Sequence, residues 1–236
     1  MSRLVNKIAI VTGSSSGIGR AIALKFSREG AVVVCADIRE IARTEILTET
    51  EIATHDLITQ NGGTAEFLKV DASKAEDEER LVGHTAIKYG RLDIPIWDFS
   101  QEVWDKDIAL NSIGSFLPCG DRGWIVNIVS VFGLTGAASM SGYVASKHAT
   151  MGVTKVAAWD CAPHRIRVNA ICPGYTDTAF ISGISGDVRG FVQQLHPFRG
   201  LGKPEDVANA AIFLASEENT WVTGIGLPVD GGYTSL

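Results

Sequence analysis

The stretch KIAIVTGSSSGIG, residues 7–19, decides the fold of this chain. Residues 8–11 are all apolar, as expected of a strand that is buried on both faces. The glycines at positions 13, 17 and 19 permit a tight turn, and the apolar periodicity that follows predicts a helix. A strand, a glycine-rich turn and a helix in this order are typical of a parallel sheet covered by helices.

The rest of the chain repeats this alternation of strand-like and helical segments. We expect strands at 7–11, 32–36, 66–70, 92–94, 125–129, 167–171 and 226–229, and helices at 18–28, 41–60, 75–89, 101–116, 143–161 and 204–215. Most predicted strands are short and rich in Val and Ile on both faces. The prediction is an α/β fold, a Rossmann-type doubly wound parallel sheet that forms a single domain over residues 1–236.

Composition and charge exclude several classes of function. The 236 residues are 45% apolar and 20% charged with a net charge of −6, so we expect no nucleic-acid-binding and no anionic membrane-binding surface. The four cysteines form no C-x-x-C pair, which predicts buried thiols rather than a metal site or a disulfide framework. No apolar run approaches the ~18 residues of a membrane span, and the first strand begins by Lys7, so we expect a cytoplasmic protein without a signal peptide.

The glycine-rich turn also predicts a dinucleotide-binding site. Glycines allow the backbone to approach a pyrophosphate, and the N-terminus of the following helix offers free N–H groups. Asp37 lies 18 residues after Gly19, close to the spacing expected for a carboxylate that binds ribose hydroxyls. Because a carboxylate repels a 2′-phosphate, we expect NAD, with NADP as the alternative and Arg39 as its phosphate partner.

A second stretch, SGYVASK at residues 141–147, predicts a reaction centre. Tyr143 and Lys147 are four residues apart, so on a helix they lie on one face. A cation beside a phenol favours the phenolate, which suits a residue that gives and takes protons in alcohol/ketone chemistry. Ser130 follows an apolar run where a strand is expected to end. Donors of this kind can meet the charge that develops on an alkoxide during hydride transfer.

Together these motifs resemble the short-chain dehydrogenase/reductase family, and the resemblance covers nearly the whole chain. It implies that Ser130 polarises the substrate carbonyl or hydroxyl, that Tyr143 transfers the proton, and that Lys147 assists Tyr143 and binds the nicotinamide ribose. Asn111 is implied to position a water that connects Lys147 to solvent. The residues expected to contact the cofactor are Gly13, Ser16, Gly17, Ile18, Gly19, Asp37, Asp71, Tyr143, Lys147, Pro173, Gly174, Thr176 and Thr178.

The resemblance adds detail to this cofactor site. Asp71 would accept a hydrogen bond from the adenine amino group, and Thr178 would bind the nicotinamide carboxamide. Thr176 would contribute through its backbone. Ser16 stands where NADP-preferring members often carry Arg or Lys, which again favours NAD.

Residues of about 176–200 are implied by the family to form a lid over the substrate. The apolar residues in it are Phe180, Ile181, Ile184, Phe191, Leu195 and Phe198. They indicate either a rather apolar secondary alcohol or ketone as substrate, or a cap over the hydrophobic core. His196 is interpreted as structural, with a substrate contact as the alternative, and the family resemblance implies a homodimer or homotetramer.

The sequence departs from the family in two places. The Asn-Asn-Ala-Gly motif that normally ends the fourth strand is absent, since residues 90–94 run directly into 95–100. The predicted helix that carries Asn111 is the second departure, because Pro118 and Gly120 end it several turns earlier than in the family. These shortenings, near 94–95 and 119–120, are either real deletions or junctions at which residues of the natural chain are missing. Two functions therefore stay open: an active dehydrogenase, or a nucleotide-binding scaffold or sensor without turnover.

Overall fold

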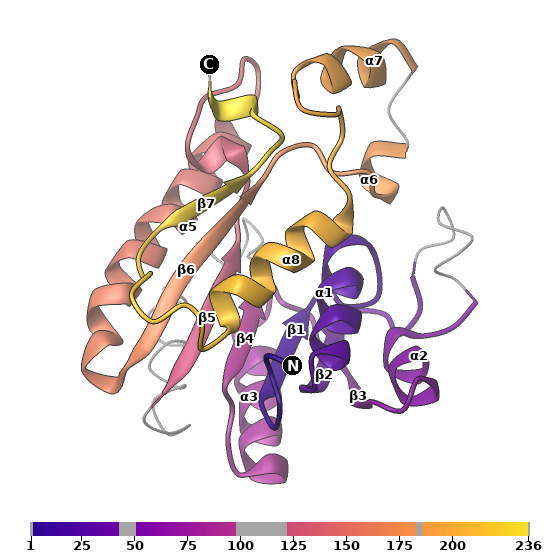
Figure 1. Cartoon of the computed structure of the whole chain (residues 1–236), viewed down its shortest axis with the longest axis vertical. Helices are drawn as coiled ribbons and strands as arrows, with labels where there is room; N and C mark the ends of the chain where they lie inside the picture. The colour runs from indigo at the N-terminus through magenta and orange to yellow at the C-terminus, as the bar shows by residue number, and fades with distance from the viewer. Residues whose placement is uncertain (1, 43–50, 98–121, 183–185, 236) are drawn as a thin grey trace.

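The computed structural model describes residues 2–42, 51–97, 122–182 and 186–235. Its centre is one parallel sheet of seven strands, β1 (Ile8–Thr12), β2 (Val32–Asp37), β3 (Thr64–Lys69), β4 (Ile94–Trp97), β5 (Gly123–Ile128), β6 (Ile166–Pro173) and β7 (Gly226–Val229). The strand order is β3-β2-β1-β4-β5-β6-β7 (Figure 1). The order reverses between β1 and β4, so this is the doubly wound sheet that the sequence predicts. In such sheets ligands bind outside the carboxyl ends of the strands.

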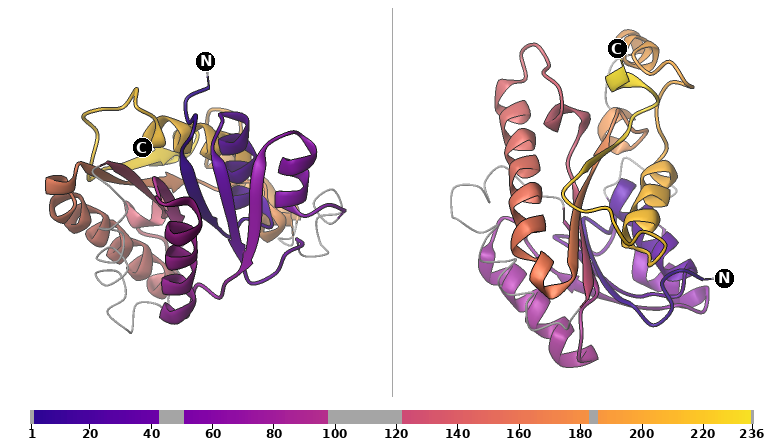
Figure 2. Two further views of the ribbon diagram at one scale, coloured as in Figure 1. Left: turned by 90° about the horizontal axis from the view of Figure 1, so that it is seen from below. Right: turned by 60° about the vertical axis from the view of Figure 1, so that its left-hand side comes forward.

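Helices cover both faces of the sheet (Figure 2). The helices are α1 (Gly17–Arg28), α2 (Thr54–Gln60), α3 (Ala75–Tyr89), α5 (Ser141–Asp160), α6 (Ala179–Ser182), α7 (Gly186–Gln194) and α8 (Pro204–Ala215), with short 3-10 turns η4 (Val131–Gly133), η5 (Ala162–His164) and η6 (Tyr233–Ser235). Helices α1 and α8 pack together on one face, whereas α3 and α5 lie on the other.

Each face has its own buried core because successive strand residues point to opposite sides. On β1, Ala9 and Val11 join the cluster that contains Phe26 of α1 and Leu214 of α8. Ile10 of the same strand joins the other cluster, with residues of α3 and α5. This two-sided burial explains why the strands are continuous apolar runs rather than alternating ones.

The fourth strand differs from the prediction of residues 92–94. Strand β4 begins at Ile94 and continues to Trp97, because Pro95 does not end it: Pro95 pairs with Ile10 and Ile96 with Val11 in unbroken register. A proline in a central strand is unusual, and its presence is why the sequence suggested an early end. The strand therefore runs through residues 94–95 in register with β1.

The helix predicted over 41–60 is wrong at residues 41–42 and 51–53, which are not helical, and α2 begins at Thr54; residues 43–50 lie outside the described part of the chain. Ala53 has an extended backbone with φ −59° and ψ 149°, which does not continue a helix. The Thr54 hydroxyl fixes the start because it donates to the Ser14 carbonyl at 2.7 Å and accepts from the Arg20 guanidinium at 2.9 Å. The predicted helix 101–116 with Asn111, and the junction near 119–120, lie outside the described residues.

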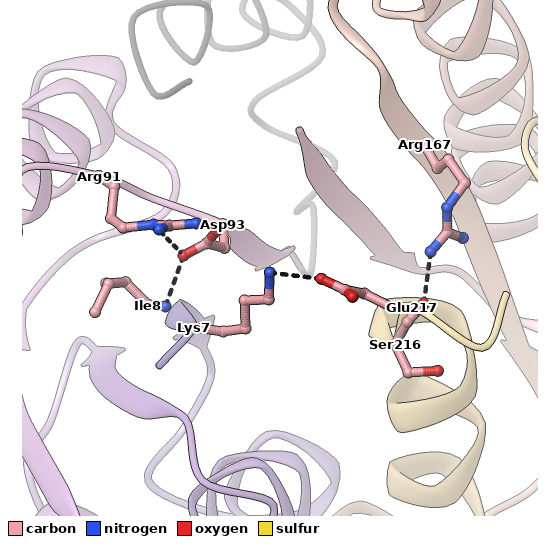
Figure 3. A network of polar contacts seen from close by, with 7 residues as sticks. All are labelled: Lys7, Ile8, Arg91, Asp93, Arg167, Ser216 and Glu217. Atoms are coloured by element: carbon pink, nitrogen blue, oxygen red, sulfur yellow. Dashed lines mark hydrogen bonds and ion pairs between the residues drawn. The ribbon is translucent and has the colours of Figure 1, made fainter. Parts of the chain in front are cut away.

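Polar side chains tie together the amino ends of the strands (Figure 3). The buried carboxylate of Asp93 accepts from the backbone N–H of Ile8 at 2.9 Å and pairs with the Arg91 guanidinium. Lys7 pairs with the exposed Glu217 at 3.0 Å. Arg167 donates to the Ser216 carbonyl at 2.9 Å, which links β6 to the end of α8. These contacts lie at the amino ends of the strands, whereas ligands are expected at the carboxyl ends.

The described cysteines, Cys35, Cys161 and Cys172, are free and buried, as predicted. Burial raises the pKa of Cys35 to about 12 and that of Cys172 to about 11, so both thiols stay protonated at neutral pH. None of the described helices has the length and hydropathy needed to cross a membrane.

Candidate active site

A cavity of about 570 Å³ opens beyond the carboxyl ends of β5 and β6. It brings together residues that the sequence predicted from segments far apart in the chain. These are Ile18, Ser130, Tyr143, Lys147, Pro173, Gly174, Thr176 and Thr178. The position beyond the carboxyl ends of parallel strands is where a doubly wound sheet is expected to bind its ligand.

Ser130 lies two residues after the end of β5 and immediately precedes the 3-10 turn η4. Its Oγ accepts a hydrogen bond from the Phe132 N–H at 3.2 Å, so the hydroxyl proton remains available to a group in the cavity. Gly133 allows this turn to lie close to α5, since a Cβ at that position would be 2.9 Å from the Lys147 carbonyl oxygen. The short S-x-x-G segment therefore sets Ser130 beside the helix that carries Tyr143.

Tyr143 and Lys147 lie on one face of α5, as the i,i+4 spacing predicts. The Lys147 Nζ is 5.7 Å from the centre of the Tyr143 ring. The Lys147 side chain is buried, at 7% exposure, whereas Tyr143 is 41% exposed and faces the cavity. A buried cation behind an accessible phenol is the arrangement needed to support negative charge on the phenol oxygen.

The turn after β6 forms the opposite wall of the cavity. The Thr176 hydroxyl donates to the Gly174 carbonyl at 3.1 Å, and Thr176 also bridges to Gly202. His196 holds this turn through the backbone: its Nε2 accepts from the Tyr175 N–H at 3.1 Å, and its Nδ1 contacts the Val192 carbonyl at 2.9 Å. Both ring nitrogens of this buried histidine are occupied by backbone groups, which is a structural role.

The glycine-rich turn has the geometry of a cradle for an anion. Gly13 has φ +64° and Gly17 has φ +55°, values that favour glycine. A Cβ built on Gly13 meets no atom within 4 Å, so this glycine faces open space. A Cβ on Gly19 would lie 2.1 Å from the Gly13 carbonyl oxygen, so only glycine lets the helix begin so close to the turn. The backbone is thus free for a pyrophosphate to approach, next to the N-terminus of α1.

Asp37 ends β2 directly beside this turn. Its Oδ2 accepts from the Ser15 N–H at 3.0 Å and its Oδ1 from the Arg39 N–H at 3.4 Å, and the side chain is half-buried. Asp71 lies two residues beyond β3, and the Ser73 hydroxyl and N–H hold the pKa of its carboxyl below its usual value. Both carboxylates lie at the same edge of the sheet as the cavity.

The sequence analysis did not predict an aromatic cluster, of which Phe132, Tyr143 and Tyr175 line the cavity. Phe132 is at its centre and makes edge-to-face contacts with Tyr143, Tyr175 and Tyr233, with ring centres 6.2, 6.0 and 6.0 Å apart. Tyr175 also contacts the His196 ring at 5.7 Å. The sequence offered a hint of these contacts, because Phe132 and Tyr175 are close neighbours of predicted site residues. Phe132 follows Ser130 by two residues, and Tyr175 lies between Gly174 and Thr176.

The apolar lining of the cavity comes from Phe132, Met140, Tyr175 and Ile181, among others. Of the expected lid residues, Ile181 lines the cavity, whereas Phe191 and Phe198 are 62% and 79% exposed and do not line it. The Phe180 side chain and Ile184 lie outside the described part of the structure. No group of three or more metal-ligating side chains converges among the described residues.

The chain is similar to characterised dehydrogenases over almost its full length. A family model described as enoyl-(acyl carrier protein) reductase matches residues 13–234. A 2,5-dichloro-2,5-cyclohexadiene-1,4-diol dehydrogenase from Sphingobium indicum is 33% identical and covers 100% of both chains. A cyclohexanol dehydrogenase from an Acinetobacter species is 34% identical over 98% of this chain and 96% of the relative. The first of these alignments spans 261 positions against 236 residues here, so it places gaps within this chain.

A solved structure gives the same result. A 7α-hydroxysteroid dehydrogenase complexed with NADH and 7-oxoglycochenodeoxycholic acid matches with a TM-score of 0.85 and 30% identity, covering 98% of this chain and 95% of the other. The sheet order, the cavity and the full-length matches therefore agree: this chain belongs to the short-chain dehydrogenase/reductase family of oxidoreductases.

Proposed function

We propose that this protein is an NAD(H)-dependent dehydrogenase that interconverts a secondary alcohol and a ketone on a rather apolar, ring-containing small molecule. The observation that carries the proposal is the cavity in which Ser130, Tyr143 and Lys147 face the turn after β6. A folded scaffold does not require a serine, a tyrosine and a buried lysine to meet in one cavity. The alternative of a scaffold or sensor without turnover is not favoured, because the relatives of this chain are named dehydrogenases.

In the proposed reaction, the nicotinamide supplies or accepts the hydride. During oxidation the Tyr143 oxygen takes the proton of the substrate hydroxyl, and during reduction the Tyr143 hydroxyl returns it. Ser130 donates a hydrogen bond to the same substrate oxygen, and Lys147 stabilises the charge on Tyr143. Asn111 is proposed, by family resemblance, to connect Lys147 to solvent.

The residues proposed to hold the cofactor fit a dinucleotide. The positive-φ glycines and the open space at Gly13 leave room for a pyrophosphate at the start of α1. Ser16, Gly17, Ile18 and Gly19 continue this cradle, and Asp71 is proposed to contact the adenine. Pro173, Gly174, Thr176 and Thr178 are proposed to lie against the nicotinamide, where they line the cavity with Tyr143 and Lys147.

NAD is the proposed cofactor, with NADP as the second choice. Asp37 places a negative charge next to the turn, where it accepts ribose hydroxyls and repels a 2′-phosphate. Arg39 is exposed, and only its backbone N–H contacts Asp37. The solved hydroxysteroid dehydrogenase was complexed with NADH, which supports the same choice.

The proposed substrate class rests on the cavity and on the relatives. The cavity lining is dominated by apolar and aromatic side chains, and Lys147 is its sole charged residue among those described. The relatives act on a cyclohexadiene diol, a cyclohexanol and a hydroxysteroid, all of which are ring alcohols. An uncharged ring that carries a secondary alcohol satisfies both observations.

The wider organisation of the protein is also part of the proposal. We infer one cofactor-binding and catalytic domain over residues 1–236, with residues of about 176–200 as the substrate lid, and a cytoplasmic location. A homodimer or homotetramer is proposed, because α5 exposes Val156 and Trp159 at 54% and 83% and the segment before β7 exposes Trp221 at 95%. Neither nucleic acid nor a membrane is a proposed partner.

The experiment is a screen of secondary alcohols and ketones with NAD(H) and NADP(H), followed by the absorbance of the reduced nicotinamide. We expect NAD-dependent oxidation of cyclohexanol and related ring alcohols. Absence of turnover with every substrate, in a protein that still binds NADH, would favour the scaffold or sensor instead.

A further inference from the structure

Tyr175 stands out among the polar groups of the cavity. Ser146 and Thr176 also line it, but their hydroxyls donate to backbone carbonyls, of Tyr143 at 2.7 Å and of Gly174 at 3.1 Å. Ser130, Tyr143 and Lys147 are the proposed reaction centre, and Thr178 is proposed to bind the cofactor. Within the described ranges, the hydroxyl of Tyr175 has neither a hydrogen-bond partner nor one of these roles.

The ring of Tyr175 is nevertheless held firmly. Phe132, His196 and Tyr233 surround it, with ring centres 6.0, 5.7 and 6.5 Å away. Its backbone is fixed on both sides, since its N–H donates to His196 and its carbonyl accepts from the Gly202 N–H at 2.9 Å. A half-buried tyrosine in such a setting holds its side chain at a defined place in the lining of the cavity.

The Tyr175 hydroxyl is also kept in its protonated form. Burial raises the pKa of this phenol, and negative charge on Tyr233 or Tyr143 raises it further. Tyr175 therefore offers both a donor and an acceptor at neutral pH. A substrate oxygen placed beside it gains a hydrogen bond in a largely apolar surrounding.

Resting on the proposed function, we propose that Tyr175 is a specificity-determining residue that binds a second oxygen on the ring of the substrate, away from the reacting alcohol. The preferred substrate is then a cyclic diol or a hydroxyketone rather than a simple cyclic alcohol. A site built to hydrogen-bond a substrate hydroxyl discriminates against the analogue that lacks it.

The test compares cyclohexanol with the 1,2-, 1,3- and 1,4-cyclohexanediols in the wild type and in Tyr175→Phe. The substitution keeps the ring and its aromatic contacts and removes only the hydroxyl. For at least one diol, the ratio of its kcat/KM to that of cyclohexanol should fall by about 3- to 10-fold, the effect of one neutral hydrogen bond. Tyr233→Phe is the matched control, because Tyr233 belongs to the same aromatic cluster but does not line the cavity. It should leave the ratio unchanged.

A binding measurement separates this inference from the proposed function. Ligand-observed NMR titration of the same four compounds, with NADH present, gives the ratio of Kd values without turnover. If the wild type oxidises no substrate of the wider screen, the proposed function fails, and the change of the Kd ratio in Tyr175→Phe still decides the role of Tyr175. A ratio that is equal in wild type and Tyr175→Phe for every diol, or that changes equally in Tyr233→Phe, overturns the inference.

Discussion

The Lys147 Nζ lies 5.7 Å from the centre of the Tyr143 ring, with the lysine buried and the tyrosine open to the cavity. This relationship follows from a spacing of four residues on α5 and is a property of the helix alone. What the helix cannot provide is the third group, Ser130, which the end of β5 and the turn η4 bring to the same cavity. The proposed chemistry depends on both.

Cofactor preference should change when Asp37 is replaced. In Asp37→Ser the carboxylate that meets the ribose is lost, so kcat/KM for NAD should fall and kcat/KM for NADP should rise. Arg39 is then available as a phosphate partner. Steady-state kinetics with both cofactors check this prediction. A wild type that already prefers NADP would show that Arg39 outweighs Asp37.

Two glycine substitutions should have opposite effects. In Gly19→Ala the new Cβ would lie 2.1 Å from the Gly13 carbonyl oxygen, so the turn must shift, at a cost of about 1–3 kcal/mol and with weaker NADH binding. Gly83 lies inside α3 with no atom within 4 Å of the added Cβ, so Gly83→Ala should stabilise the protein by about 0.5–1 kcal/mol. Urea unfolding and NADH fluorescence titration measure both quantities. Equal stability of the two variants would contradict the described turn.

The amino ends of the strands offer a test of stability away from the site. Asp93→Ala leaves the buried Ile8 N–H without its acceptor, which should cost about 1–3 kcal/mol of unfolding free energy. Glu217→Ala is the control, since its pair with Lys7 is largely exposed and such pairs contribute about 0–1 kcal/mol. Urea unfolding of wild type and both variants measures the two losses of unfolding free energy. A loss in Glu217→Ala as large as that in Asp93→Ala would contradict the assignment.

Much of the fold was predictable from the sequence because the apolar periods are local. The ends of α3 and α8 and the bounds of β7 agree with the predictions, since glycine, proline and charged residues mark them. Strand β4 was misplaced because local rules treat Pro95 as a strand end, whereas pairing with β1 retains it. The start of α2 was misplaced because its cause, the contact of Thr54 with Ser14, is tertiary.

The candidate site was predictable only where one segment carries the chemistry. The Tyr143/Lys147 pair and the glycine-rich turn are local motifs, so they could be recognised. The aromatic cluster joins Phe132, Tyr175, Tyr233 and His196 from four segments, and no local sequence pattern predicts such contacts. For the same reason, exposed Phe191 and Phe198 could not be told from cavity-lining residues by sequence.

Stability should fall in acid partly through Asp230. Burial alone would raise the pKa of this carboxyl, but hydrogen bonds from Thr234 and Gly232 hold it below the usual 3.8. The carboxylate therefore stabilises the folded state above about pH 4, and this contribution is lost as the pH falls through the lowered folded-state pKa. In Asp230→Asn, the decrease in unfolding free energy between pH 5 and pH 2.5 should be smaller than in wild type. Asp160→Asn, at the exposed end of α5, is the control, and an identical pH dependence in wild type and Asp230→Asn would refute the role of Asp230.

The central claim is that Tyr143 transfers the proton in an NAD(H)-dependent alcohol oxidation. The most direct measurement is kcat for oxidation of a ring alcohol in wild type and in Tyr143→Phe, with NADH affinity and thermal unfolding measured on the same samples. The substitution keeps the ring against Phe132 and removes the hydroxyl, so folding and NADH binding should persist while kcat falls by ~10²–10⁴-fold. A folded, NADH-binding Tyr143→Phe protein with nearly the wild-type kcat would contradict this account.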